Sequence, residues 1–303
     1  MPPDDIVQPF QIDGNSLRGR LVRLGPVVDD ILARHAYPGP IAVLLAETLA
    51  LCAALAATLK FDGVFSIQAR GDGPVNLLVA DVSTGGEIRG YARYEPERLS
   101  GIDTRDDQSP APIARLLGSG YLAFTVDQGA NTELYQGIVA LEGDTLAECV
   151  HHYFRQSEQL PTRVLLAADR SAGGDWRAGA LMVQKMPAEG GHESSTVSGD
   201  DGWNRAMALM GTCSNREMLD PELSPQALLY RLFHEDGVRV YETRPLKAGC
   251  RCSRDRIVDV LRGIGPEQMK ELEHDGRVEV VCEFCNRKYV FDHNDLGRIF
   301  TTH

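Results

Sequence analysis

Four cysteines near the C-terminus constrain the fold of this chain more than any other feature. Cys250 and Cys252 form a Cys-x-Cys pair, and 29 residues later Cys282 and Cys285 form a Cys-x-x-Cys pair. Structural zinc is commonly held in a tetrahedron of thiolates offered as two short-spaced pairs. The spacing therefore predicts one Zn²⁺ per reduced chain. Four thiolates leave no open coordination position, so the pattern does not favour a catalytic zinc.

The sequence around the cysteines predicts how the two pairs meet. Cys282 and Cys285 lie between two strand-like stretches, 278–281 and 288–291, which indicates a hairpin whose turn carries both thiols. Two helices are expected between the pairs, one beginning near Ser253 or Asp255 and one at Gly265-Pro266. His274 and His293 are conceivable substitute ligands, but lone histidines usually lie at the surface, and we do not include them.

The energetics of such a small segment give the metal a decisive role. Residues 247–303 contain too few core apolar side chains to be stable by burial alone. Structural zinc contributes apparent free energies of roughly 10–16 kcal/mol in finger peptides. Zinc should therefore decide whether this segment is folded, and oxidation of its thiolates should release the metal. A Cys-x-Cys disulfide is geometrically tight, and strained bridges are easily reduced, so the oxidation could be reversible.

The other cysteines indicate a reducing compartment. The chain has seven cysteines, an odd number, and its first residues lack an apolar signal region. A disulfide framework fits this usage poorly, and we expect a cytoplasmic protein. Cys52 and Cys149 lie in apolar helical patterns and should be buried. Cys213 lies in a polar context, where it could be exposed.

Composition argues against two classes of partner. The formal net charge is −12, whereas general nucleic-acid binders and proteins that dock on anionic membranes need a basic surface. Residues 41–59 are apolar enough to be weighed as a membrane span, but seven of them are alanine and Glu47 lies among them. A carboxylate in mid-span costs roughly 2.5–3.5 kcal/mol or more. A buried core helix is the better interpretation.

The remaining pattern predicts an α+β fold with a large N-terminal core, a helical linker and a small C-terminal zinc-binding domain. Helices are expected at 22–36, at 41–60 and after Asp144, and antiparallel strands at 64–68, 75–82, 87–94, 121–126, 135–141, 164–168 and 178–186. Residues 189–202 have almost no apolar side chains and should be mobile. Helices at 203–218 and 226–234 follow. The predicted domains are 1–188, 189–246 and 247–303.

Several segments, taken together and in order, carry a family resemblance. They are residues 58–63 (TLKFDG), 71–77 (GDGPVNL), 141–146 (LEGDTL) and 157–163 (SEQLPTR), followed by the two cysteine pairs. With these segments the chain resembles, over nearly its whole length, the redox-regulated 33 kDa heat-shock chaperone family, the bacterial heat-shock protein 33 holdase.

The resemblance implies a chaperone core, a metastable linker and a redox-switch domain. Cys250, Cys252, Cys282 and Cys285 would be both the zinc ligands and the redox-active cysteines. In such proteins the reduced, zinc-bound form is inactive. Oxidation to two disulfides releases zinc, unfolds switch and linker, and yields a homodimer that holds unfolding clients without ATP. The shortest closures are Cys250–Cys252 and Cys282–Cys285, and Cys213 lies outside this set.

Two other functions can be drawn from the same cysteines. One is a zinc-ribbon module that binds nucleic acid, although residues 247–303 lack the basic surface it needs. The other is a thiol–disulfide oxidoreductase, although no thioredoxin-like βαβ pattern surrounds the Cys-x-x-Cys pair. The sequence contains no P-loop, and Gly71-Asp72-Gly73-Pro74 is typical of a turn rather than a phosphate cradle. We therefore do not expect an enzyme.

Overall fold

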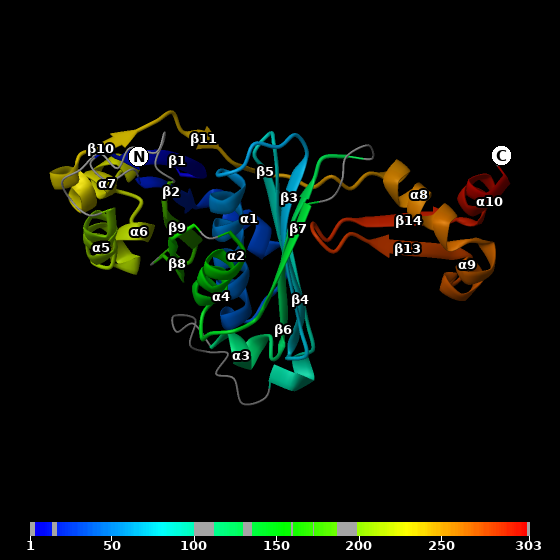
Figure 1. Ribbon diagram of the computed structural model, residues 1–303. Coiled ribbons are helices and arrows are strands. Elements are labelled where there is room, and N and C mark those ends of the chain that lie inside the picture. Colours follow the sequence, from blue (N-terminus) through cyan, green and yellow to red (C-terminus); the bar gives the residue numbers. More distant parts are fainter. Residues whose placement is uncertain are drawn as a thin grey trace. The chain divides into compact units, whose positions relative to one another are not determined.

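The computed structural model describes residues 4–13, 17–99, 112–129, 135–158, 160–171, 173–186 and 199–301. The chain divides into two compact units, Met1–Ala248 and Gly249–His303. Helices and antiparallel sheets are mixed throughout, so the predicted α+β class is confirmed (Figure 1). The predicted division into the domains 1–188, 189–246 and 247–303 stays a prediction.

The first sheet of the larger unit joins strands from both ends of that unit. Its order is β10-β1-β2-β9-β8, with β11 paired to the other part of β1. The strands are β1 (Ile6–Ile12), β2 (Leu17–Leu24), β8 (Thr162–Arg170), β9 (Trp176–Lys185), β10 (Val238–Val240) and β11 (Arg244–Pro245). All of these pairings are antiparallel. The late strands β10 and β11 thus fasten residues 238–245 to the N-terminal strand.

The second sheet has the order β12-β5-β4-β3-β6-β7. Its strands are β3 (Val64–Gly71), β4 (Val75–Ser83), β5 (Glu87–Tyr94), β6 (Gly120–Asp127), β7 (Tyr135–Ala140) and β12 (Lys247–Ala248). The antiparallel pairing expected from the strand spacing is confirmed for β3–β4, β4–β5 and β6–β7. β12 adds a short parallel pairing to β5.

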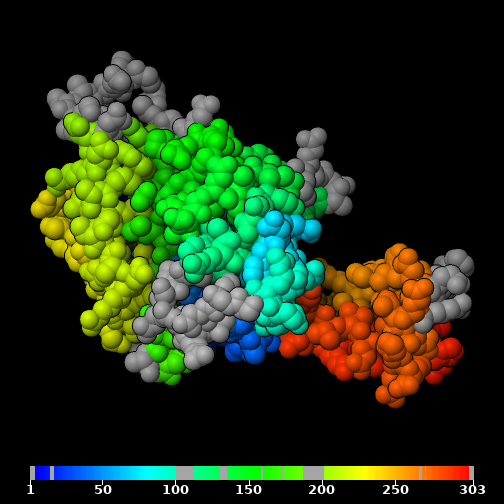
Figure 2. All heavy atoms as spheres, turned by 90° about the horizontal axis from the view of Figure 1, so that it is seen from below, coloured from blue at the N-terminus to red at the C-terminus, as the bar shows by residue number. Residues whose placement is uncertain are grey.

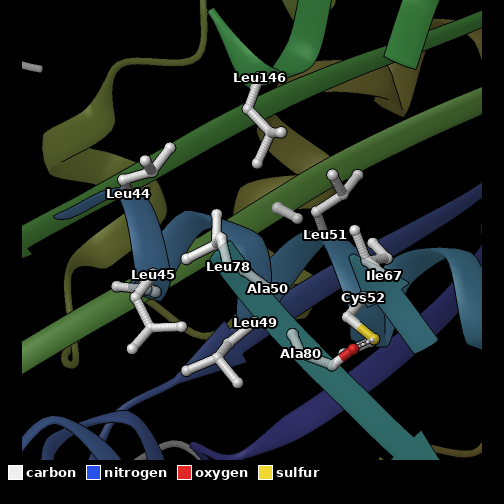
Figure 3. Packing of buried hydrophobic residues seen from close by; sticks show 14 of the residues in the cluster. Leu44, Leu45, Leu49, Ala50, Leu51, Cys52, Ile67, Leu78, Ala80 and Leu146 are labelled. Carbon is white, nitrogen blue, oxygen red and sulfur yellow. Dashed lines mark hydrogen bonds between the residues drawn. The ribbon is translucent and has the colours of Figure 1, made fainter. Parts of the chain in front are cut away.

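The apolar stretch considered as a membrane span is the central core helix α2 (Gly39–Ala56). It lies between the two sheets (Figure 1). Its length and composition would allow it to cross a membrane, but 94% of that window is buried inside the protein. Glu47 is partly buried, and every other residue of the helix is fully buried. Figure 3 shows Cys52 of this helix packed near Ile67, with its thiol donating to the carbonyl oxygen of Ala80 at 3.4 Å.

Shorter helices complete the core, and one sequence prediction here is wrong. The helix expected at 22–36 is strand β2 up to Leu24, followed by α1 (Pro26–Ala33), which begins with proline in its first turn. Val22 and Leu24 pair with β9. The prediction was wrong because the apolar residues keep a helix-like spacing across the junction between β2 and α1. The other helices are α3 (Ile113–Leu116), α4 (Leu146–Tyr153), the π-turn η3 (Phe154–Glu158) and the 3₁₀ helix η2 (Pro96–Leu99).

The glycines of the 71–74 turn are explained by a close approach of backbone. A Cβ on Gly71 would lie 1.8 Å from the carbonyl oxygen of Leu117, and one on Gly73 would lie 2.5 Å from that of Leu116. The Asp72 carboxylate accepts a hydrogen bond from the Ser119 backbone N–H at 2.7 Å. The segment is a turn between β3 and β4, as predicted, and it is locked to the chain at 116–119.

The linker segment, defined as residues 189–246, is described from Gly199 onward. It contains α5 (Gly199–Met210), α6 (Asn215–Leu219), α7 (Pro225–Phe233) and the 3₁₀ turn η5 (His234–Asp236). The single helix expected at 203–218 is therefore two helices. Ser214 forms a capping box with Glu217 and starts α6 after a break. Of the stretch predicted to be mobile, residues 199–202 form the start of α5, and 189–198 lie outside the described residues.

These linker helices pack on the first sheet through an apolar cluster. Sheet side chains include Phe10, Ile12, Leu17, Leu21, Leu181 and Val183, and linker side chains include Ala206, Met210, Met218, Leu228, Leu229, Leu232 and Phe233. The rings of Phe10 and Phe233 stack with centroids 5.8 Å apart. Figure 2 shows the yellow-green atoms of the linker segment directly against green atoms of the core. We call this cluster the linker interface.

The smaller unit has its own modest core. It contains α8 (Arg254–Ile264), α9 (Pro266–Leu272), the hairpin β13 (Arg277–Val281) and β14 (Lys288–Asp292), and α10 (His293–Thr301). The two helices and the hairpin are confirmed, including the Ser253 cap, whereas α10 was not predicted. The buried apolar side chains are Leu261, Met269, Val278, Tyr289, Phe291, Leu296 and Ile299. Leu272 of α9 is 50% exposed.

Candidate metal centre

The four C-terminal cysteines converge on one point in the smaller unit. Cys250 and Cys252 lie on the extended segment before α8, Cys282 follows β13 directly, and Cys285 lies in the turn before β14. The Sγ atoms of Cys250 and Cys282 are 3.7 Å apart, and those of Cys252 and Cys285 are 3.4 Å apart. All four sulfur atoms lie within 4.8 Å of one another, and all four are free thiols.

This geometry fits a tetrahedral metal site. A zinc–sulfur bond of about 2.3 Å places neighbouring sulfurs of a tetrahedron roughly 3.8 Å apart. Two of the sulfur separations, 3.7 Å for Cys250–Cys282 and 3.4 Å for Cys252–Cys285, are close to that spacing. A single metal ion could therefore be held by these four cysteines with only small adjustments. The soft thiolate set is the kind that structural zinc prefers.

The hairpin turn positions two of the thiols. The backbone N–H of Asn286 donates to the carbonyl oxygen of Cys282 at 2.8 Å, and that of Cys282 donates to the carbonyl oxygen of Arg287 at 2.9 Å. Asn286 has φ 56°, a left-handed conformation that asparagine tolerates better than most residues. This turn brings Cys282 and Cys285 to the same end of the hairpin, where the Cys-x-Cys segment lies.

The electrostatics of the cluster favour a thiolate at Cys250. Partial burial opposes ionisation, but hydrogen bonds from the Cys252 backbone and from the neighbouring thiols lower the pKa of Cys250 to about 7. Partial burial, with hydrogen bonds donated to the other sulfurs, raises the pKa of Cys285 to about 12. The thiols thus share their protons unequally. A cation at their centre would favour the ionised form of all four.

Tyr289 supports the cluster and was not anticipated from the sequence. Its hydroxyl donates to the Sγ atom of Cys252 at 3.2 Å from strand β14. A hydrogen bond of this kind orients a ligand and disperses its charge. Its signal in the sequence was weak, because a tyrosine four residues beyond a Cys-x-x-Cys pair is equally typical of a strand packed in a small core.

The other three cysteines belong to the larger unit. Burial raises the pKa of Cys52 well above its ordinary value and that of Cys149 to about 11. Both are fully buried, as expected. Cys213, considered exposed from its polar context, is instead only 9% exposed within the linker interface. Burial also raises its pKa. High pKa values and burial make these three thiols poor nucleophiles.

The two histidines weighed as substitute ligands do not join the cluster. His293 is paired weakly with Glu273 at 3.9 Å, and its side chain is 87% exposed. His274 forms a backbone bridge with Arg277 at the start of the hairpin. Among the described residues, the metal-binding group consists of the four cysteines.

A buried arginine fastens the linker segment to the first sheet, and sequence reasoning missed it. Arg23 of β2 is 1% exposed. Its guanidinium donates to the carbonyl oxygens of Asp220 at 2.8 Å, of Glu217 at 3.1 Å and of Leu223. Arg177 of β9 adds a bond to the carbonyl of Leu219 at 2.7 Å. Since these acceptors are backbone groups of α6 and of the loop that follows it, no residue type in the sequence marks them.

An α+β core followed by a small unit with four convergent thiols defines a two-unit protein whose smaller unit could hold a metal ion. The family model described as Hsp33 protein matches residues 5–292. The 33 kDa chaperonin of Caulobacter vibrioides (strain NA1000 / CB15N) is 44% identical over 293 residues, covering 95% of each chain. That of Pseudomonas fluorescens (strain SBW25) is 39% identical over 302 residues, covering 99% of this chain and 95% of the relative.

This chain therefore belongs to the Hsp33 family, as its sequence segments indicated. The crystal structure of the 33 kDa chaperonin from Thermotoga maritima has the same fold, with a TM-score of 0.82 at 24% identity over 98% of both chains. The family is one of molecular chaperones rather than of catalytic enzymes. Membership implies that the protein binds unfolded client proteins.

Proposed function

We propose that this protein is a redox-regulated, ATP-independent holdase of the cytoplasm whose zinc-bound reduced form is inactive. The observation that carries the proposal is the convergence of Cys250, Cys252, Cys282 and Cys285 in a unit with a very small core. Such a unit depends on its metal for stability. The thiol chemistry of the cluster can therefore control whether the unit is folded.

The zinc ligands in this proposal are the four cysteines, and oxidation is the trigger. A peroxide accepts two electrons and two protons from a pair of thiols, forming one disulfide and two water molecules. Two peroxides thus convert the four thiols into two disulfides, which no longer provide the thiolate ligands that zinc needs. The loss of a stabilising contribution of roughly 10 kcal/mol exceeds the stability of a small unit.

We assign the disulfides to Cys250–Cys252 and Cys282–Cys285. In the folded unit the cross-pairs Cys250–Cys282 and Cys252–Cys285 are also close, at 3.7 and 3.4 Å. Proximity in the folded state therefore does not decide the pairing. Once zinc leaves and the unit unfolds, short loops close at a lower entropic cost than loops of about 30 residues. Local pairing is then favoured.

The client-binding surface in this proposal becomes exposed when the linker segment detaches. The linker interface buries Phe10, Leu17 and Leu181 of the first sheet under helices α5–α7. Detachment would uncover both apolar faces, and exposed patches of this kind capture unfolded chains. The same uncovered surface would form the homodimer of the oxidised state. No nucleic acid or membrane takes part in the proposed function.

Zinc and thiols counted together test this proposal. Stoichiometric peroxide should release one zinc per chain while four thiols disappear, and peptide mapping should find mainly Cys250–Cys252 and Cys282–Cys285. A Cys213→Ala variant serves as the matched control, because its thiol is buried in the larger unit and is not one of the four clustered cysteines. It should release zinc as the unmodified protein does. A dominant bridge to Cys213, or zinc retained after the four thiols are lost, would contradict the proposal.

A further inference from the structure

An open cleft on the larger unit is lined by positive charge in a protein that is acidic overall. Its volume is about 1120 Å³, and it lies between β2, the end of α2, the 83–86 turn and residues 241–246. Four cationic side chains line it, namely Arg18, Arg20, Lys60 and Arg244. One carboxylate, that of Glu242, lies among the same lining residues. The net charge of the whole chain is −12.

These four cations have no ion-pair partners in the part of the chain that the structure describes. By contrast, arginines elsewhere on the same unit are paired, for example Arg89 with Asp81 at 3.0 Å and Arg177 with Asp4 at 2.6 Å. Composition does not explain the difference, because acidic residues outnumber basic ones, 43 to 31. Four cations are thus gathered on one concave surface without neutralisation.

Arg20 is held in place at the centre of this group. Its guanidinium donates to the carbonyl oxygen of Ala57 at 3.2 Å and to that of Gly19 at 2.7 Å. Burial, followed by the charges of Arg244 and Arg18, lowers the pKa of Arg20. The charges of Arg244 and Arg18 therefore oppose the charge of Arg20. A cleft lined by one sign of charge concentrates ions of the opposite sign.

The remaining walls suit an anionic group that carries several oxygens. Guanidinium forks match phosphate oxygens, and lysine adds a point charge. The Ser83-Thr84-Gly85-Gly86 turn also lines the cleft, and Thr84 and Gly85 are exposed there. Phe61 and the partly exposed Tyr241 supply aromatic surface next to the cations. One carboxylate ligand would neutralise a single cation, whereas a diphosphate group carries enough charge for several of them.

We propose that this cleft is a binding site for a diphosphate-bearing ligand, which bridges Arg244 to Arg18 and Arg20. Arg244 belongs to the segment 241–246, whereas both other arginines belong to β2. The segment is held to β1 by the β11 pairing and by backbone bonds at its ends, Tyr241 N–H to the Pro9 carbonyl at 3.0 Å and Leu246 N–H to the Asp5 carbonyl at 2.7 Å. A bound diphosphate adds a side-chain bridge from this segment to β2. This site does not rest on the proposed redox mechanism.

Calorimetric titration of the reduced, zinc-loaded full chain tests the site. The probes are inorganic diphosphate and ADP, without Mg²⁺, and zinc content is measured afterwards to verify that the metal is retained. One diphosphate should bind per chain, and Arg18→Gln and Arg244→Gln should each weaken binding about tenfold, as expected for a lost charge-assisted hydrogen bond. Tighter binding of ADP than of inorganic diphosphate would show that the ligand is a nucleotide. Equal binding would assign recognition to the phosphates alone.

Arg216→Gln on α6 is the matched control. It removes the same charge from an exposed position that does not line the cleft, and binding should change less than twofold. Hydrogen exchange at the amides of 241 and 246 should slow when diphosphate is bound. Absence of saturable binding, or equal weakening by Arg216→Gln and Arg244→Gln, would overturn the site. Unchanged exchange in 241–246 would overturn the bridging geometry.

Discussion

Cys282 is one of the four cysteines that could hold a metal ion in the smaller unit. It links the hairpin to the Cys250 side of the cluster, 3.7 Å away. We predict that Cys282→Ser lowers zinc affinity by at least tenfold, because a hydroxyl is a poor ligand for zinc beside three thiolates. The unit Gly249–His303 should lose its fixed structure while the larger unit keeps its own. Metal content and circular dichroism of the purified variant measure both effects.

Cys213→Ala is the comparison for this variant. It removes a thiol of similar chemistry from the linker interface and leaves the four-cysteine cluster intact. Full zinc content is expected. Full zinc content in a Cys250→Ser/Cys282→Ser double variant would show instead that these cysteines are not the ligands.

Glu47 gives the core helix a pH-dependent stability. Burial raises the pKa of its carboxyl from 4.5 to about 7. The folded state therefore holds the proton more tightly than the unfolded state, and the ionised form costs folding free energy. The contribution of this carboxyl to the free energy of unfolding is fully present below pH 4.5, and it is lost as the pH rises through 7. Glu47→Gln should thus stabilise the protein at pH 8, by up to about 3 kcal/mol, with little effect at pH 4.5.

Urea unfolding of the two proteins at both pH values measures this difference. The comparison isolates Glu47, since all other titrating groups are shared. An equal stability difference at both pH values would show that the Glu47 carboxyl does not titrate in this range.

At the scale of single residues, the sequence identified functional side chains where their spacing is typical of a known chemistry. The four cysteines were identified from their intervals, and Glu47 from its position inside an apolar stretch. Arg23 could not be identified in this way. Its acceptors are backbone carbonyls about 200 positions away, including Asp220 at a separation of 197. No side-chain pattern records such a contact.

Helix α7 contributes an aromatic side chain to the cover of the first sheet. Phe233 at its end is fully buried and stacks on Phe10. We predict that Phe233→Ala weakens the docking of the linker segment by about 3–5 kcal/mol, the usual cost of removing a buried aromatic ring. If docking masks the client-binding surface, this variant should protect a denaturing client partly even when reduced and zinc-loaded.

Tyr230→Ala supplies the control on the same helix. Its ring is 65% exposed, so removal of an aromatic side chain there should leave docking and activity unchanged. Limited proteolysis of residues 199–246 measures docking independently of activity. Identical proteolysis of both variants would show that the linker interface does not depend on α7.

Among the elements, local signals predicted local structure well. Ser224 and Pro225 fixed the start of α7, and alternation on either side of Cys282 and Cys285 fixed the β13–β14 hairpin. Strand β1 was missed because its residues Ile6–Ile12 contain Pro9 and two glutamines, which hide the alternation. The α5–α6 break was missed because the methionines continue a helical spacing across Gly211 and Ser214.

At the scale of the whole molecule, the linker segment is part of the larger unit in the reduced fold. Strands β10 and β11 pair with β1, and β12 pairs with β5, so residues 238–248 are joined to both sheets. These pairings connect positions more than 150 residues apart, and turn or periodicity signals carry no information about them. Release of the linker segment must therefore break edge-strand pairings as well as the apolar linker interface.

The smaller unit begins directly after this last strand, at Gly249. Loss of its zinc would turn a folded unit, attached next to β12, into an unfolded chain. The central claim is that this local event governs whether the surface beneath α5–α7 is covered. According to this claim, oxidation of four sulfur atoms controls the chaperone activity of the whole molecule.

Light scattering of a heat-denaturing client protein, without nucleotide, tests this claim most directly. The full chain is compared in its reduced, zinc-loaded form and after peroxide has released the metal. The account predicts that the oxidised protein suppresses aggregation at near-stoichiometric amounts, whereas the reduced protein leaves the scattering curve unchanged. Equal protection by both forms would contradict it, because the four cysteines would then stabilise a small unit without controlling the chaperone.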